Sequence, residues 1–303
     1  MVTSPSNTTP SLLGGREYHD TTSNYSLPKD AKEHYRLDVQ HDVIKDIAGG
    51  NYVAPLQNYE GAVRDILDLG CGNGRWAIEI AQEFPAANVI GVDLSPVEKE
   101  LLPQNCKFIV ADITMFPLPF EDSSFDVVQM RIVPSLPDRS KIIPEIYRVL
   151  RPNGFVLFLE PSHVISRTLP GRIQSPAFAD GDRLIALSPH TNGRDWSIAE
   201  VIRGMLLNSK REGGESMFHA IGEITIHLPV GTWPEDPKRA QQGAIGAEMQ
   251  IHLYDGFGPM LIKHDLISEG GFKDLMDKLT AETNDHSLQL EQPFVFAWGQ
   301  KRL

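Results

Sequence analysis

Residues 66–74, with the sequence ILDLGCGNG, decide the fold of this chain. An apolar run that carries one aspartate, Asp68, is followed at once by a turn of alternating glycines. Glycine adopts positive φ angles easily and has no Cβ atom to keep a ligand away from the backbone. At the carboxyl end of a parallel strand, such a turn forms a crevice for a nucleoside-containing cofactor. We therefore predict a strand over residues 65–69, a cofactor-binding turn, and a helix over residues 74–84.

Two further strand-like segments also end at an aspartate. Residues 88–93 end at Asp93, and residues 107–111 are followed by Asp112. Because neighbouring parallel strands end at the same edge of a sheet, the three aspartates are predicted to lie at one site. A carboxylate at this edge can accept hydrogen bonds from both hydroxyls of a ribose. The alternative is that Asp68 and Asp112 only cap helices.

The glycine spacing favours one class of nucleoside cofactor. The turn has the pattern G-x-G-x-G, and the residue two after Gly74 is Trp76, not a third glycine that would allow close helix packing as in a dinucleotide site. A pyrophosphate binds at a helix N-terminus and is repelled by a neighbouring anion such as Asp68. S-adenosylmethionine carries an ammonium, a sulfonium and a ribose but no phosphate. The sequence therefore favours S-adenosylmethionine over NAD. An NAD site would instead imply an oxidoreductase.

The remaining pattern predicts an α/β fold with a Rossmann-like, seven-stranded, mostly parallel sheet. Asp30 begins a helix that Gly49 ends. Strands and helices alternate up to residue 160, and the pattern then becomes irregular. The further predicted elements are strand 125–130, helix 140–150, turn 151–154, strand 155–160, helix 199–208, strand 222–229, a helical region over 240–279 interrupted at 256–259, and strand 293–300.

Composition excludes several classes of protein. The net charge of -12 leaves no basic stripe for nucleic acid, and no apolar run reaches the length of about 20 residues that a membrane helix needs. The two cysteines, Cys71 and Cys106, do not suggest a disulfide framework. The first 15 residues lack the features of a signal peptide. We expect a soluble cytoplasmic protein, or a nuclear one if its role is regulatory, with neither nucleic acid nor membrane as partner.

Four stretches carry a resemblance to a known family. In chain order they are residues 15–19 (GREYH) with 25–30 and 36–41, the glycine turn with 91–96 (GVDLSP), residues 125–131 with 147–154 (YRVLRPNG), and residues 228–234 (LPVGTWP) with 236–237. They resemble class I S-adenosylmethionine-dependent methyltransferases, more narrowly the fungal group typified by the secondary-metabolism regulator LaeA and its relatives in natural-product clusters. Residues 162–220 depart from the group, so its substrates cannot be carried over.

The resemblance implies a division of the chain. Residues 1–15 would be a disordered tail, and residues 16–60 a segment that covers the cofactor. Residues 61–161 would form the Rossmann-like core that binds S-adenosylmethionine. Residues 162–220 would be a helical insertion that acts as a substrate lid after the fifth strand, and residues 221–303 would complete the same domain.

The resemblance also implies roles for individual residues. Asp68 would lie near the ammonium of the cofactor, and Asp93 would bind its ribose, with Leu94 and Ser95 beside the adenosine. Contact with the cofactor has an alternative for four residues. Arg131 would instead form a surface ion pair, and Tyr25, Arg36 and His41 would instead have structural roles. The remaining cofactor-binding residues would be the turn residues Gly70, Cys71, Gly72, Asn73 and Gly74, with Asp112 and Ile113 at the adenine, Met130 and Arg131 at the reactive face, and Tyr25 and Arg36 in the covering segment.

These residues predict a methyltransferase that acts on a small molecule by in-line displacement, most simply at an oxygen atom. Methyl transfer to nitrogen, sulfur or carbon remains an alternative. His163 follows the fifth strand and is the candidate catalytic base, since a histidine titrates near neutral pH. The spacing of the other histidines predicts no metal site. The competing hypothesis is a LaeA-like regulatory protein that binds the cofactor and acts through protein partners.

Overall fold

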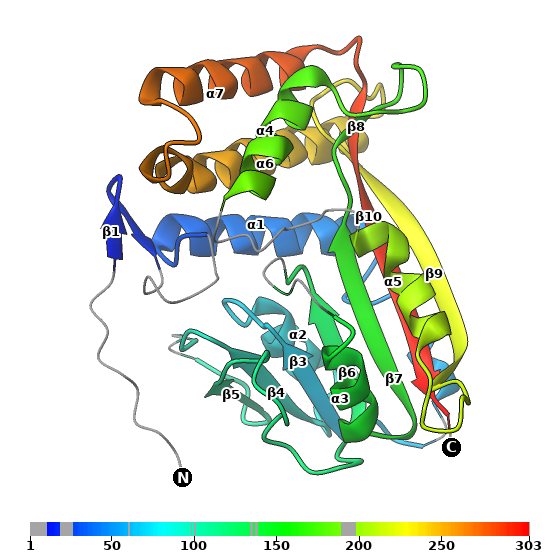
Figure 1. The fold of residues 1–303 in the computed structure, drawn as a ribbon. Coiled ribbons are helices and arrows are strands. Elements are labelled where there is room, and N and C mark those ends of the chain that lie inside the picture. The colour runs from blue at the N-terminus through cyan, green and yellow to red at the C-terminus, as the bar shows by residue number, and fades with distance from the viewer. Residues whose placement is uncertain are drawn as a thin grey trace.

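The structure is a computed structural model that describes residues 11–18, 27–59, 61–97, 99, 101–133, 136, 139–188 and 198–302. Its centre is an eight-stranded sheet (Figure 1). The strands of this sheet are β3 (Asp65–Leu69), β4 (Asn88–Asp93), β5 (Cys106–Val110), β6 (Phe125–Arg131), β7 (Leu150–Pro161), β8 (Ile165–Ser166), β9 (Phe218–Pro229) and β10 (Leu290–Lys301).

The strand order along the sheet is β5-β4-β3-β6-β7-β10-β8, and β9 also pairs with β10. The first five strands in this order are parallel, whereas β10 runs antiparallel to β7, β8 and β9. The predicted α/β fold with a mostly parallel sheet is therefore confirmed. The two-residue strand β8 is an eighth member that the sequence pattern did not predict.

Seven helices are described, and they occupy three places around the sheet. Figure 1 shows α1 running across the carboxyl ends of the parallel strands, with α4, α6 and α7 in a layer beyond it. The short hairpin of β1 (Ser11–Leu13) and β2 (Arg16–Tyr18) lies at one end of α1. The helices are α1 (Ala31–Ala48), α2 (Arg75–Glu83), α3 (Ile142–Val149), α4 (Pro176–Leu187), α5 (Ile198–Asn208), α6 (Pro237–Lys263) and α7 (Glu269–Asn284). None of the helices described is long and apolar enough to cross a lipid bilayer.

Helix α1 begins and ends where the sequence predicts. The Asp30 side chain accepts a hydrogen bond from the backbone N–H of Glu33, and Gly49 ends the helix with a φ of 75°. Polar residues make up four of its six buried side chains, which are Glu33, Arg36, Gln40, His41, Val43 and Ile44. A helix buried on a polar face needs partners for that face, and α1 finds them in α2 and in the site below it.

Alternating residues of the central strands fill two hydrophobic cores on opposite faces of the sheet. Val128 and Val156 pack in one core with the apolar face of α3, and Val127 and Phe155 pack in the other with α2. This alternation follows from the two-residue repeat of a strand. A third core joins α4, α6 and α7. The sheet is thus buried on both faces, and its carboxyl-terminal edge lies beneath α1.

Two predicted breaks are wrong. The turn predicted at residues 151–154 lies inside β7, which begins at Leu150. Asn153 takes a φ of 62°, which asparagine tolerates better than most residues, and the pairing with β6 shifts register there. Leu150 pairs with Phe125 and Phe155 pairs with Val127, so β7 rejoins β6 after this bulge and continues, with β10 on its other side from Phe155 onward.

The helical break predicted at residues 256–259 is also absent, because α6 continues to Lys263. Gly256 and Gly258 instead allow close packing, since a Cβ atom at position 258 would lie 2.3 Å from the Phe272 ring of α7. The chain turns later, where Ser268 caps α7. In addition, β1 lies within residues 1–15, so the prediction of a disordered tail fails for residues 11–13.

The close approach of α6 to the end of β9 gives a stability prediction. A Cβ atom at position 246 would lie 2.3 Å from the carbonyl oxygen of Pro229, so Gly246→Ala should destabilise the fold by about 1–3 kcal/mol. Gly204→Ala on α5 is the matched control, because a Cβ atom there meets nothing within 4 Å and should stabilise the helix by about 0.5–1 kcal/mol. Urea unfolding measures both, and equal midpoints would contradict the packing.

Candidate functional site

A pocket lies between α1 and the carboxyl ends of β3, β4 and β6. Its empty volume is about 1000 Å³, which includes the open solvent at its mouth. All three strand-end aspartates line it, so the prediction that they meet at one place is confirmed. The lining residues are Leu37, Gln40, His41, Asp68, Gly70, Cys71, Gly72, Asn73, Arg75, Trp76, Asp93, Leu94, Ala111, Asp112, Ile113, Thr114, Arg131, Ile132, Val133 and Leu136.

The glycine turn forms the floor of this pocket. Gly70 has a φ of 73°, and a Cβ atom there would lie 2.6 Å from Cγ2 of Val133. The backbone N–H groups of Gly70 and Cys71 both donate to the carbonyl of Val92, at 2.8 and 3.0 Å. These bonds tie the turn to β4. Backbone conformation and packing therefore both require glycine at position 70.

The Asp93 carboxylate is held by backbone groups of the turn. Its Oδ2 accepts from the N–H of Gly72 at 2.8 Å, and its Oδ1 accepts from the N–H of Ser95 at 3.1 Å. Burial raises the pKa of Asp93, although these backbone bonds oppose the shift. Each oxygen retains a second lone pair, so the carboxylate can accept two further hydrogen bonds from a ligand.

Asp68 is a buried carboxylate that finds no hydrogen-bond partner in the part of the chain that the structure describes. Its side chain belongs to a residue that is only 1% exposed, and neither oxygen has a hydrogen-bond partner in the described part of the chain. Burial raises its pKa to about 7, the nearby Arg131 guanidinium lowers it, and Asp93 raises it further. Buried carboxylates are normally paired, so an orphan lining a pocket indicates a site for a cationic or hydrogen-bond-donating group.

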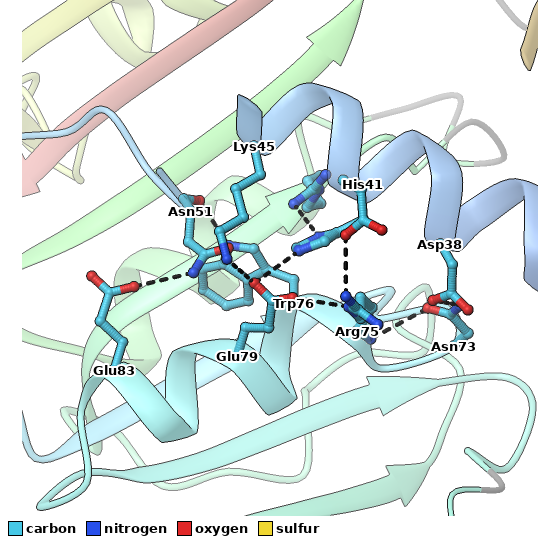
Figure 2. A network of polar contacts seen from close by, with 11 residues as sticks. Asp38, His41, Lys45, Asn51, Asn73, Arg75, Trp76, Glu79 and Glu83 are labelled. Carbon is cyan, nitrogen blue, oxygen red and sulfur yellow. Dashed lines mark hydrogen bonds and ion pairs between the residues drawn. The ribbon is translucent and has the colours of Figure 1, made fainter. Parts of the chain in front are cut away.

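A chain of polar contacts connects the far wall of the pocket to α2. Nη1 of Arg131 lies 3.3 Å from Nδ1 of His41, and Nε2 of His41 lies 3.2 Å from Oε2 of Glu79. The second contact is close enough for an ion pair but lacks the geometry of a good hydrogen bond. Lys45 and Arg75 also donate to Glu79, at 2.5 and 2.9 Å (Figure 2).

Along these contacts Arg131 is positively charged, His41 is neutral and Glu79 is negatively charged near pH 7. Burial lowers the pKa of His41 to about 4, and the Arg131 cation lowers it further, so the ring is neutral near pH 7. Burial alone would raise the pKa of Glu79, but its bonds to Lys45, His41 and Arg75 bring it down to about 2. Burial lowers the pKa of Arg131 to about 10, which leaves the guanidinium charged. His41, Asp42 and Glu79 have metal-ligand spacing, but Lys45 and Arg75 already pair with the carboxylates.

The structure separates several predicted site residues from the pocket. Arg36 does not line it and pairs instead with Glu33, with Nη2 and Oε1 2.6 Å apart. Met130 is fully buried in the sheet, Gly74 is the N-cap residue of α2, and neither Gly74 nor Ser95 is among the lining residues, although the N–H of Ser95 donates to Asp93. Tyr25 lies outside the described residues. The predicted residues that do line the pocket are Asp68, Gly70, Cys71, Gly72, Asn73, Asp93, Leu94, Asp112, Ile113 and Arg131.

The alternative that Asp68 and Asp112 only cap helices can be compared with the structure, and the two residues differ. Asp68 caps no helix, because α2 begins after Gly74 without a side-chain cap. Asp112 does form a local turn, since its Oδ1 accepts from both the N–H and the hydroxyl of Thr114, at 2.8 and 2.7 Å. Asp112 therefore lines the pocket while also stabilising its own loop.

His163 lies beyond the pocket and belongs to a second polar cluster. Its Nδ1 is 2.8 Å from Oδ2 of Asp182 on α4, which also accepts from Gln174. Tyr254 on α6 donates to the other oxygen of Asp182 at 2.5 Å. A carboxylate partner fixes the proton of a neutral imidazole on Nδ1 and makes Nε2 the basic nitrogen.

Sequence reasoning placed the segment that contains α1 over the cofactor and named His41 in it, but it did not name Leu37 and Gln40 as site residues. Leu37 and Gln40 line the pocket beside His41, and Asn73 donates from the glycine turn to Asp38 at 2.8 Å. The spacing of residues 37, 40 and 41 places them on one face of a helix, and that face could have been recognised. Val133 was also missed, because residues that follow a strand in a loop carry no periodic signal.

The unpaired carboxylate of Asp68 gives a pH-dependent stability prediction. The folded protein holds this proton with a pKa of about 7 instead of 3.8, so the free energy of unfolding should fall as pH rises from 4 to 7. Asp68→Asn has no carboxyl group to ionise at this position. Without ligand, its free energy of unfolding relative to that of the wild type should therefore rise by up to about 4 kcal/mol between pH 4 and pH 8. Denaturant titrations at several pH values measure this, with the exposed Asp122→Asn as control; parallel curves for wild type and Asp68→Asn would contradict the burial.

Comparisons with known proteins agree on one family. A family model described as a methyltransferase domain matches residues 66–154. The methyltransferase str2 of Strobilurus tenacellus is 29% identical over 236 residues, which are 75% of this chain and 82% of that protein. The secondary metabolism regulator laeA of Monascus pilosus is 34% identical over 233 residues, 73% of this chain, and this chain spans 59% of that protein.

The solved structures support the same fold. A phosphoethanolamine N-methyltransferase of Haemonchus contortus, in complex with S-adenosylhomocysteine, covers 95% of this chain with a TM-score of 0.50 and 18% identity. This chain covers 62% of that one. The strand order, the glycine turn with its buried aspartate, and the relatives lead to one conclusion. The chain is a class I S-adenosylmethionine-dependent methyltransferase of the LaeA-like group.

Proposed function

We propose that the pocket beneath α1 holds S-adenosylmethionine with its amino-acid end at Asp68 and its nucleoside end at Asp93 and Asp112. The observation that carries this proposal is the buried Asp68 carboxylate, which has no hydrogen-bond partner among the described residues. The ammonium of the cofactor would supply both charge and donors there. The positive-φ backbone at Gly70 and Gly72 leaves room for the methionine chain.

The other parts of the cofactor have complementary partners. The free lone pairs of Asp93 suit the two ribose hydroxyls, and the apolar side chains of Leu94 and Ile113 suit the faces of the adenine. Asp112 would accept from the exocyclic amine. Arg131 would bind the carboxylate, so that a zwitterionic amino acid would lie between the buried Asp68 anion and the partly buried Arg131 cation. Arg36 takes no part in this arrangement, because Glu33 already occupies it.

The reaction we propose is transfer of a methyl group to an oxygen atom of a small molecule. The cofactor supplies a methyl group on a positively charged sulfur, which leaves as a neutral thioether. The residues of the pocket need to align the acceptor oxygen with the methyl carbon and the sulfur, and to exclude water. Alignment of this kind can lower a barrier by about 7–11 kcal/mol. Nitrogen, sulfur or carbon acceptors would use the same alignment.

His163 would act as the base where the acceptor must lose a proton. It follows β7, whose residue Leu159 pairs with Arg131 of β6, so the ends of both strands lie at the same edge of the sheet. Asp182 would hold the ring with Nε2 as the basic nitrogen. Residues 162–220 would contribute the acceptor-binding lid, and the acceptor would belong to secondary metabolism, as the names of the laeA relatives suggest.

A second function is a regulatory protein that binds the cofactor and acts through protein partners. It is favoured by the relatives named as secondary metabolism regulators, such as laeA of Monascus pilosus. Turnover of S-adenosylmethionine with extracts of a producing organism would favour the enzyme. Co-purification with transcription regulators in the absence of any turnover would favour the regulator.

The placement of the nucleoside predicts a specific loss of affinity. Asp93→Asn should weaken binding of S-adenosylhomocysteine by about tenfold or more, because charge-assisted hydrogen bonds to the ribose are lost. Isothermal titration calorimetry measures the affinity. Asp122→Asn, which changes an exposed carboxylate, should bind as the wild type does. Unchanged affinity of Asp93→Asn would remove the proposed placement.

The role of His163 predicts a dependence on the acceptor. With methyl-labelled cofactor and a panel of phenols and carboxylic acids, the wild type should label at least one class of oxygen acceptor. His163→Gln should lower kcat for phenols by about 10²–10⁴-fold, since these must lose a proton. Carboxylic acids are already ionised near pH 7 and should be affected little. His219→Gln, near the start of β9, is the control, and an equal loss for both acceptor classes would contradict a base at position 163.

A further inference from the structure

We infer that His41 is a positioning residue, which holds the Arg131 guanidinium against the carboxylate of the cofactor. The inference rests on the proposed placement of S-adenosylmethionine and assigns to α1 a part in recognising its amino-acid end. Three observations carry it. The first is which atoms donate and accept in the Arg131–His41 contact, the second is the arrangement of Asp68 and Arg131, and the third is the contact of His41 with Glu79 on α2.

Only one assignment of donor and acceptor fits the contact between Arg131 and His41. Arginine carries donors and no acceptor, so Nδ1 of His41, 3.3 Å from Nη1, must accept the hydrogen bond. The proton of the neutral ring is then on Nε2, which lies toward Glu79 at 3.2 Å. A protonated ring would repel the guanidinium. His41 therefore acts as a neutral acceptor between a cation and an anion.

Arg131 is directed by His41 and not by the nearest acid of the pocket. Neither oxygen of Asp68 has a hydrogen bond within the described residues, although Asp68 and Arg131 are close enough to influence each other's pKa. His41 uses one of the five guanidinium N–H groups, and Arg131 is one of the residues that line the pocket. Asp68 and Arg131 thus remain available for the two opposite charges of an amino acid.

The orientation of His41 is set from the other side of the ring. Figure 2 shows Glu79 on α2 reaching toward His41, with Lys45 of α1 bonded to the same carboxylate. Arg75 holds the second oxygen of Glu79 at 2.9 Å and also pairs with Asp42. Lys45 and Arg75 fix the Glu79 carboxylate, and turning the ring away from Arg131 would move Nε2 of His41 away from it.

Two ligands distinguish binding of the amino-acid end from binding of the nucleoside end. S-adenosylhomocysteine carries both ends, whereas 5′-methylthioadenosine lacks the ammonium and the carboxylate. We expect His41→Leu to weaken S-adenosylhomocysteine by about tenfold while leaving 5′-methylthioadenosine within about twofold of wild type. His41→Gln should recover part of the loss, because its amide oxygen can accept from Arg131. Calorimetry gives the affinities, and thermal unfolding shows that both variants are folded at the temperature used.

A double-mutant cycle with Arg131→Met tests whether the two residues act together. If His41 acts through Arg131, the double variant should bind S-adenosylhomocysteine no more weakly than Arg131→Met alone. An equal loss for both ligands, additive losses in the cycle, or full affinity in His41→Leu would each overturn the inference. Failure of the proposed function looks different, because the wild type would then bind neither ligand.

Discussion

The structure depends on the burial of one negative charge at the end of β3. Asp68 lies beneath α1 with both oxygens unbonded among the described residues, and burial raises its pKa to about 7. Such a charge is unfavourable in a folded protein unless a partner arrives. The glycine turn, the neutral His41 and the partly buried Arg131 are arranged around it, so the pocket presents one negative and one positive side chain.

The cofactor half of the fold could be predicted because its signals are local. The strands β3 and β4 begin and end at the predicted residues, and the cap at Asp30 and the stop at Gly49 define α1. These features depend on neighbouring residues in the chain. The three aspartates were brought together correctly because parallel strands place their ends at one edge.

The errors come from tertiary packing that overrides local preference. Residues 151–154 look like a turn, yet they form a bulge inside β7, because Leu150 before them and Phe155 after them both pair with β6. Residues 256–259 look like a break, yet the helix continues through them, and Gly258 allows the close contact with Phe272 of α7. Arg36 was expected at the cofactor, but Glu33 lies one helical turn away and takes its charge. The role of His41 could not be derived from sequence, since it depends on residues in three separate elements.

The position of β10 also affects how the chain can fold. It is the last strand along the described chain, and yet it lies inside the sheet, paired with β7 on one side and with β9 on the other. Until it is synthesised, β7 and β9 would each present an open edge, which is prone to pairing with other chains. A ribosome-bound chain would therefore carry a cofactor half that can form early and a sheet that closes late, and it would depend on chaperones during that interval.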